Sequence, residues 1–210
     1  MMIFSSMITD FPTKLILASA SPRRKELLAK AGAGYRVLVS DADESFTAPI
    51  AGDELVKLLS HRKASAVADT LGEFPPDTLI LAADTVVVSP DGTILGKPVD
   101  AADAKSMLTA LSGTPHHVYS GFTLLWKDHA YSHAVDSIVT FKPLPEADID
   151  AYIATGEPFG KAGAYAIQGL GGNLVAKLDG DFTNVVGLPM PALEEAIRTL
   201  FGKSLCDFIA

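Results

Sequence analysis

The sequence predicts an α/β fold built on a mixed, extended sheet. Two short apolar runs, 14–19 and 78–83, are typical of buried strands, and helical segments alternate with them early in the chain. Two longer segments, 117–126 and 131–141, predict strands joined by a polar turn, which favours antiparallel pairing in the middle of the chain. Both kinds of pairing are therefore expected in one sheet.

Local start and stop signals place the remaining elements. Ser21-Pro22 is an N-cap followed by a first-turn proline, so a helix should run from there to Gly32. A strand over 35–40 should end in the acidic turn 41–44, and the second buried strand should carry Asp84 at or near its end. The other expected elements are a long helix from about 53 to 71, a hairpin over 86–95, helices over 101–111, 145–155 and 191–201, and a Gly-rich segment over 160–172.

Composition limits the classes of function. The chain has 210 residues, of which 48% are hydrophobic, and its net charge of −8 argues against a general nucleic-acid binder. A small phosphorylated ligand needs only a few local cations, so it is not excluded. Cys206 is the single cysteine, which rules out a disulfide framework and favours a reducing cytosol. No apolar run reaches the roughly 20 residues that span a bilayer, and residues 1–8 form a poor secretory signal. A cytoplasmic protein with no membrane partner is expected.

The turn that opens the first helix is a candidate phosphate site. A helix N-terminus offers unpaired N–H groups and a partial positive charge. Ser19 and Ser21 add hydroxyl donors there, and Arg23 and Arg24 add guanidinium groups suited to phosphate oxygens. Cations in a first helical turn oppose the helix dipole, so local stability does not explain them. The alternative is a solvated basic turn.

Other charged candidates lie farther along the chain. Asp84 could hold a metal or act as a base, or merely cap a turn. Lys63 interrupts an apolar helical stripe, so its ammonium either reaches water or meets an anion. Lys97 is an isolated loop cation. The acidic turn that contains Glu44 suits a hard cation such as Mg²⁺, although clustered loop acids are often only solvated.

Several familiar motifs are missing from the sequence. The five histidines form no zinc signature, and there is no Walker A sequence and no nucleophile elbow. The glycines of 169–172 lack the strand-to-helix context of a dinucleotide loop. The residues by themselves therefore indicate a phosphorylated small ligand with a metal, and they do not define a reaction.

Five segments of the sequence form a specific combination: Ser19-Ala20-Ser21-Pro22-Arg23-Arg24-Lys25-Glu26-Leu27-Leu28, Ala83-Asp84-Thr85-Val86-Val87, Gly96-Lys97-Pro98, Ala162-Gly163-Ala164-Tyr165-Ala166-Ile167-Gln168-Gly169 and Thr183-Asn184-Val185-Val186-Gly187-Leu188-Pro189. Together they resemble the motifs of the Maf family of nucleotide pyrophosphatases. They occur in family order from Lys14 to the last helix, so residues 1–13 look like an N-terminal extension and 14–210 like a single domain.

The resemblance implies an elongated fold shared with inosine triphosphate pyrophosphatases, with two lobes around a cleft. It implies hydrolysis of a nucleoside triphosphate to the monophosphate and pyrophosphate, a divalent metal (Mg²⁺ or Mn²⁺), a cytoplasmic location and a homodimer. Asp84 matches the catalytic acid that activates water, and Asp84 and Glu44 would hold the metal. The matching phosphate-binding positions are Ser19, Arg24, Lys63 and Lys97.

Substrate preference can be carried over at three positions. Arg23, Thr85 and Gln168 match the branch that acts on dTTP and UTP, whereas a sister branch acting on 7-methyl-GTP has Trp, Gln and Glu there. The alternatives are a pyrophosphatase for 7-methyl-GTP or modified nucleotides, a nucleotide-binding regulator of cell division, and a simple phosphatase that releases orthophosphate.

Overall fold

The computed structural model describes residues 12–209 except 47–48 and 74. Its centre is a seven-stranded sheet with the order β2-β1-β3-β5-β6-β7, and β4 pairs with β3 off this path. The strands are β1 (Lys14–Leu17), β2 (Arg36–Val37), β3 (Thr78–Val88), β4 (Ile94–Leu95), β5 (Pro115–Trp126), β6 (His129–Phe141) and β7 (Val175–Asp179). The predicted extension 1–13 lies outside the described residues except for Pro12 and Thr13.

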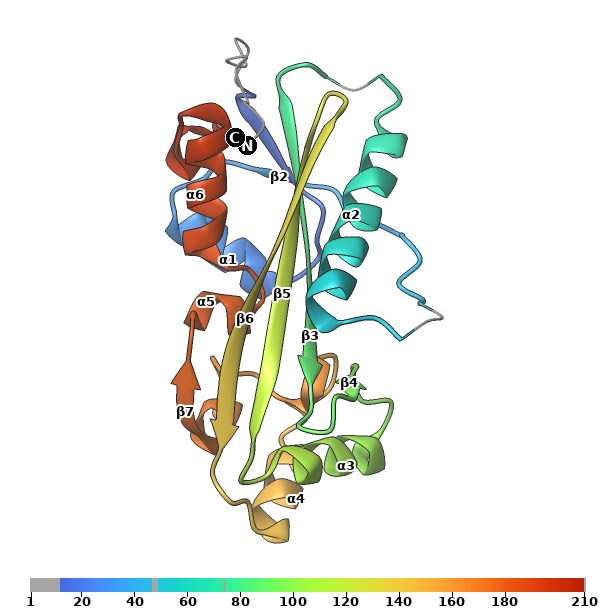
Figure 1. Cartoon of the computed structure of the whole chain (residues 1–210), viewed down its shortest axis with the longest axis vertical. Helices are drawn as coiled ribbons and strands as arrows, with labels where there is room; N and C mark the ends of the chain where they lie inside the picture. The colour runs from blue at the N-terminus through green and yellow to red at the C-terminus, as the bar shows by residue number, and fades with distance from the viewer. Residues whose placement is uncertain (1–11, 47–48, 74, 210) are drawn as a thin grey trace.

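The sheet is mixed, as the sequence predicted. β1 pairs in parallel with β2 and β3, and all pairs from β3 through β7 are antiparallel. The long hairpin of β5 and β6 is in register from Pro115↔Thr140 to Trp126↔His129. These two strands run along most of the molecule, which makes it elongated (Figure 1).

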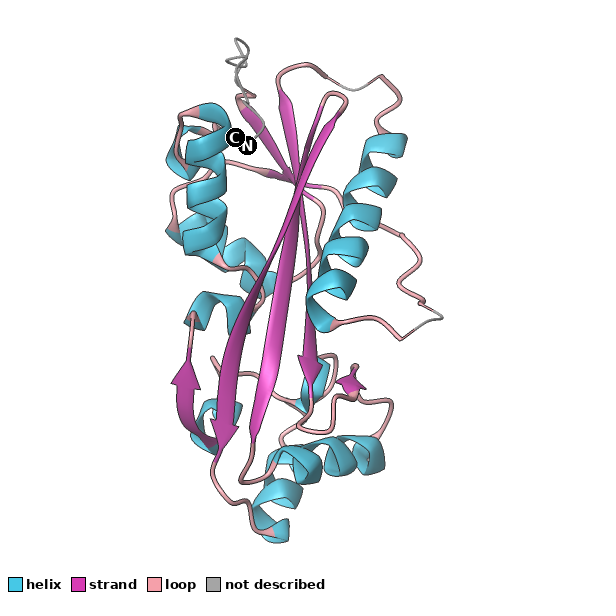
Figure 2. Ribbon diagram, viewed as in Figure 1, coloured by secondary structure: helices cyan, strands magenta, loops and turns pink. Residues whose placement is uncertain are grey.

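Helices cover both faces of the sheet, as Figure 2 shows. The α-helices are α1 (Pro22–Lys30), α2 (Gly52–Thr70), α3 (Ala101–Leu111), α4 (Glu146–Ala154), α5 (Phe182–Val186) and α6 (Met190–Phe201), and the 3₁₀ turns are η1 (Ala162–Ala164), η2 (Leu170–Leu174) and η3 (Leu205–Asp207). The Ser21 side chain accepts from the Arg24 N–H at the start of α1, and Pro22 occupies the first turn, so the predicted cap is confirmed.

Alternation along β1 and β3 separates two cores. Successive strand residues point to opposite faces, and Leu15 and Leu79 pack with α1 and α6 on one face. Ile16 and Ile80 pack on the other face against Ala64 of α2 and its neighbours. Successive side chains of β3 therefore pack alternately against α1 and α6 on one face of the sheet and against α2 on the other.

A third core forms the opposite end of the molecule. There the far ends of β5 and β6 pack with α3, α4 and η1 around Leu108, Phe141 and Ile149. Because the long strands pass from the first two cores into this one, the molecule has the two lobes that the family resemblance implied.

Two parts of the element prediction were wrong. The strand expected over 35–40 is reduced to Arg36–Val37, because it pairs only with Ile16 and Leu17 at an exposed edge of the sheet. β7 and α5 were not predicted, because neither shows a periodic apolar pattern long enough to be distinguished from a loop. Within the described residues, no helix has both the length and the apolar character needed to cross a bilayer.

Candidate active site

The site lies at a gap in one edge of β3. β1 pairs with β3 as far as Leu81, and β4 pairs with it only from Val87, while β5 occupies the opposite edge throughout. The sequence placed Asp84 at or near a strand end, and this was wrong: Asp84 is in the middle of β3, opposite Gly121. It is nevertheless accessible, because its neighbouring strands stop on either side of it.

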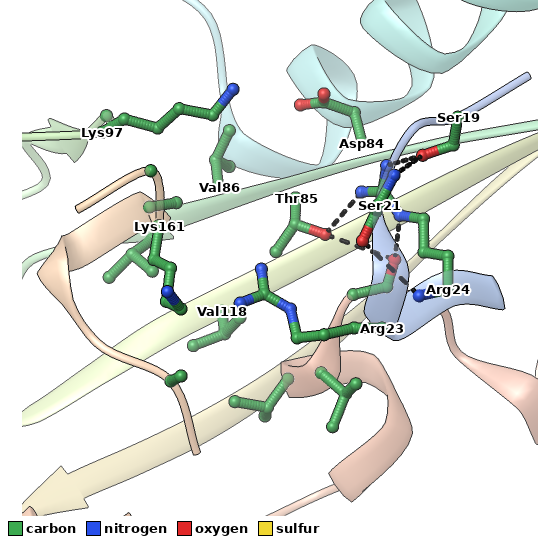
Figure 3. A pocket seen from close by; sticks show the side chains of 18 of the residues that line it. Ser19, Ser21, Arg23, Arg24, Asp84, Thr85, Val86, Lys97, Val118 and Lys161 are labelled. Carbon is green, nitrogen blue, oxygen red and sulfur yellow. Dashed lines mark hydrogen bonds between the residues drawn. The ribbon is translucent and has the colours of Figure 1, made fainter. Parts of the chain in front are cut away.

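A cavity of about 920 Å³ opens at this gap. Its lining includes every residue that the sequence and the family resemblance predicted for the site: Ser19, Arg23, Arg24, Glu44, Lys63, Asp84, Thr85, Lys97 and Gln168. Figure 3 shows six of them, Ser19, Arg23, Arg24, Asp84, Thr85 and Lys97, which come from separate segments of the chain. The structure thus brings the predicted residues together, and it does not by itself assign their roles.

Asp84, Lys63 and Glu44 form a charged cluster on the α2 side of the cavity. Asp84 points to this face because of the strand alternation, and it is only 7% exposed. The Lys63 ammonium donates to Oδ1 of Asp84 and lies 3.1 Å from Oε1 of Glu44. Within the described residues, Oδ2 of Asp84 accepts no hydrogen bond. Lys63 therefore meets anions rather than water, and one Asp84 oxygen is left for a ligand.

The loop that carries Glu44 is attached to the same helix. Arg62, one residue before Lys63, donates to the backbone oxygen of Ser45 at 2.7 Å. Asp43 accepts hydrogen bonds from the Ser45 N–H and hydroxyl, and these bonds lower the pKa of its carboxyl group. Asp43 is thus a turn-forming acid, and Glu44 is the member of the acidic turn that reaches the cavity. Arg62 also explains why a second cation interrupts the apolar pattern of α2.

Arg24 links three segments on the other face of β3. Its Nε donates to the Gly187 carbonyl at 2.8 Å, Nη1 to the Ser19 hydroxyl at 3.2 Å, and Nη2 to the Thr85 hydroxyl at 3.2 Å. A guanidinium has five N–H groups, so two remain for a ligand. The basic turn is therefore not merely solvated, and Arg24 positions Ser19 and Thr85 whatever else it contacts.

Two residues that shape the site, Asn184 and Lys161, were not identified from the sequence. Asn184 of α5 is fully buried and bonds to the backbone of Val118 and Ser120 in β5, which places Gly187 next to Arg24. Lys161, within the Gly-rich segment 160–172, lines the cavity. Asn184 lies within a motif that the family resemblance covered but to which no role was given, and Lys161 resembles any other loop lysine.

The Lys97 loop is attached to the Gly-rich segment. The Gly163 N–H donates to the Gly96 carbonyl at 3.0 Å. Gly163 has a φ of +67° and a Cβ there would lie 2.9 Å from the Val87 side chain, so only glycine fits. This contact holds exposed Lys97 at the rim of the cavity.

The donor set is suited to a hard divalent cation. Glu44 and Asp84 both contact the ammonium of Lys63, so their carboxylates converge on one point. No group of three or more His, Cys, Asp or Glu side chains capable of holding a metal occurs among the described residues. Mg²⁺ commonly uses one or two carboxylates together with substrate phosphates and water, and the two carboxylates fit that pattern.

The fold and the cavity define an α/β protein with a mixed-charge cleft beside β3, an inner strand of its sheet. The sequence matches the family described as Maf-like protein over residues 14–200. The chain belongs to the Maf family.

Named relatives cover nearly all of this chain. It is 46% identical to a dTTP/UTP pyrophosphatase of Bacillus cytotoxicus over 88% of this chain and 94% of the relative. It is also 46% identical to a dTTP/UTP pyrophosphatase of Citrifermentans bemidjiense over 90% of this chain and 96% of the relative. The solved structure of the Staphylococcus aureus Ham1 protein aligns over 61% of this chain and 71% of its own, with 12% identity and a TM-score of 0.41.

Proposed function

We propose that the protein hydrolyses dTTP and UTP to the nucleoside monophosphate and pyrophosphate. The observation that carries the proposal is the cavity at β3, which gathers cations suited to a triphosphate around a buried carboxylate with one free oxygen. The names of the relatives from Bacillus cytotoxicus and Citrifermentans bemidjiense support the choice of substrate.

In the proposed mechanism, Asp84 orients or deprotonates the attacking water. Lys63 fixes Oδ1 of Asp84, so the free Oδ2 can accept a hydrogen bond from water and then its proton. A general base contributes a factor of about 10² to 10⁴ to the rate. The water would attack the α-phosphorus, and the β-phosphate would leave with the γ-phosphate as pyrophosphate.

The cations of the cavity would bind the phosphate oxygens and stabilise the charge that builds up on the leaving group. Lys97 at the rim, the Ser19 hydroxyl and the two unused N–H groups of Arg24 are the donors placed for this. Lys63 would act mainly through Asp84 and Glu44, to which it is already bonded.

Glu44 and Asp84 would hold Mg²⁺ or Mn²⁺. When bound, such an ion neutralises phosphate charge and acts as a Lewis acid. Substituting Glu44 should weaken the response of activity to added metal, and chelation with EDTA should abolish turnover reversibly.

We further propose that residues 14–210 function as one domain, because the cavity takes its lining from Ala18 to Gly187 and no shorter piece completes it. A homodimer and a cytoplasmic location stay predictions. Size-exclusion chromatography with light scattering measures the first, and fractionation of cells expressing the tagged protein measures the second.

A panel of triphosphates read for two products tests the function. Purified protein with Mg²⁺ or Mn²⁺ is given dTTP, UTP, CTP, 7-methyl-GTP and ITP, and pyrophosphate and orthophosphate are measured separately. We expect pyrophosphate release with the highest kcat/KM for dTTP and UTP. Preference for 7-methyl-GTP would indicate the sister activity, orthophosphate release a simple phosphatase, and tight nucleotide binding without product a regulator.

Asp84→Asn tests the proposed base. The amide keeps the shape of the side chain but cannot accept a proton, so kcat should fall by at least about a hundredfold. Asp136→Asn is the matched control, because Asp136 is an exposed acid on β6 paired with His117 outside the cavity. Near-normal turnover by folded Asp84→Asn would remove Asp84 from the mechanism.

A further inference from the structure

Lys161 is a second cation that lines the cavity next to Arg23. Its ammonium donates to the backbone oxygens of Glu157 at 2.7 Å and Phe159 at 3.4 Å. An ammonium has three N–H donors and no acceptor, so one donor remains. In Figure 3 the charged ends of Lys161 and Arg23 face each other from different walls.

Within the described residues, no carboxylate forms an ion pair with Lys161 or Arg23. The nearby Glu157 carboxylate is occupied, because it accepts from the N–H groups of Leu170 (3.0 Å) and Gly171 (2.8 Å) and from the Tyr152 hydroxyl (2.8 Å). Among the described residues, Arg23 has no hydrogen bond or ion pair, and its Nε is buried without a partner. The pair is therefore ready to donate to a ligand that enters the cavity.

Electrostatics agrees with the geometry. Burial lowers the pKa of Lys161, and the positive charge of Arg23 lowers it further, whereas Glu157 raises it. Burial also lowers the pKa of Arg23. Each of two neighbouring cations disfavours the charge of the other, and ligand atoms that accept hydrogen bonds would relieve this repulsion.

The chemistry of the pair selects among nucleobases. Uracil and thymine have two carbonyl oxygens with one N–H between them, and Gln168, at the same cavity, has an amide oxygen that can accept from that N–H. Cytosine replaces one carbonyl with an amino donor, which two donor-only side chains cannot satisfy. The 7-methylguanine ring carries a positive charge, which both cations would repel.

We propose that Lys161 is a specificity-determining residue, which acts with Arg23 as a two-donor clamp on the carbonyl oxygens of a uracil or thymine base. This inference rests on the proposed function and deepens it, because it adds a residue outside the set matched by the family resemblance. It also places the base on the Arg23 side of the cavity, away from Asp84 and Lys63.

The test compares UTP with CTP in wild type and in Lys161→Met. Removing one charged donor should lower kcat/KM for UTP by about tenfold or more, mainly through KM, and should leave kcat/KM for CTP within about twofold. Lys161→Arg, which keeps the charge and the donors, should restore most of the preference. Lys177→Met, at an exposed lysine of β7 paired with Asp179, is the neutral control.

Lys97→Met provides the contrasting result. Because Lys97 is proposed to contact phosphate, Lys97→Met should lower kcat/KM for UTP and for CTP by the same factor. If Lys161→Met also lowered kcat/KM for both nucleotides equally, Lys161 would be a phosphate ligand or a loop anchor, and the proposal would be overturned. If Lys161→Met has the same melting temperature as Lys161→Arg, its lower activity is not caused by loss of the fold.

Binding of the monophosphates separates this inference from the proposed reaction. By isothermal titration calorimetry, wild type should bind UMP more tightly than CMP, and Lys161→Met should lose that difference. This readout needs no turnover. If wild type released no pyrophosphate from UTP but still preferred UMP through Lys161, the reaction would be wrong and the base clamp right; equal binding of UMP and CMP by wild type would overturn the clamp.

Discussion

Arg24 connects the residues of the cavity through one side chain. Its fork reaches Ser19 after β1, Thr85 in β3 and Gly187 after α5, and these segments are far apart in the sequence. Thr85 in turn contacts the Ser120 hydroxyl at 2.7 Å. This requires the planar guanidinium, whose donors are on three separate nitrogens, whereas a lysine ammonium has all its donors on one nitrogen.

Arg24→Lys tests whether geometry or charge matters. Losing the three bonds should lower the free energy of unfolding by about 2–4 kcal/mol, and kcat/KM for UTP should fall nearly as far as in Arg24→Met. Urea unfolding and steady-state kinetics measure the two effects. Arg198→Met, at an exposed arginine of α6, should change stability by less than about 0.5 kcal/mol. Full rescue by lysine would mean that Arg24 acts as a point charge.

At the scale of elements, short α5 is held in place by buried polar bonds as well as by the packing of Val186 in the core. The Asn184 Oδ1 accepts from the Ser120 N–H at 3.0 Å, and its Nδ2 donates to the Val118 carbonyl at 2.8 Å and the Ser137 hydroxyl at 2.9 Å. A five-residue helix has little stability of its own. These bonds to β5 and β6 therefore decide where Gly187 lies.

Asn184→Ala should uncouple α5 from the sheet. Buried groups of Val118 and Ser120 would lose their partners, at a cost of about 2–4 kcal/mol in unfolding free energy. The shift of Gly187 should also reduce kcat, measurable at a temperature where the variant is fully folded. Asn173→Ala is the control, because Asn173 is exposed on η2 and should tolerate the change. Unaltered activity in a destabilised Asn184→Ala protein would separate α5 from the site.

Over the whole molecule, local signals in the sequence were sufficient for most elements but not for their pairing. Proline and capping residues located α1, and apolar runs located β1 and the start of β3, since both depend on neighbours in the sequence. The gap beside Asp84 depends on where β1 and β4 stop along β3, which no local pattern encodes. Asn184 and Lys161 were missed for the same reason, because the partners of Asn184 and the Arg23 neighbour of Lys161 lie in distant segments.

The second lobe contains a buried histidine that should make the stability of the whole molecule depend on pH. His116 is 0% exposed, lies edge-on to Phe141 and Tyr165, and contacts the Tyr165 hydroxyl at 3.0 Å. Burial lowers the pKa of His116 to about 4, whereas an unfolded histidine titrates near 6.5. Between these values the unfolded chain binds a proton that the folded chain does not, so acid favours unfolding.

The expected result is a loss of about 2–3 kcal/mol of unfolding free energy from this group between pH 7.5 and 4.5. His116→Phe should remove that part of the pH dependence, because phenylalanine fits the aromatic surroundings and does not titrate. Urea unfolding at a series of pH values measures the slope, and His61→Asn, at an exposed histidine of α2, should keep the wild-type slope. If His116→Phe kept the same slope as wild type, the acid sensitivity would not arise from His116.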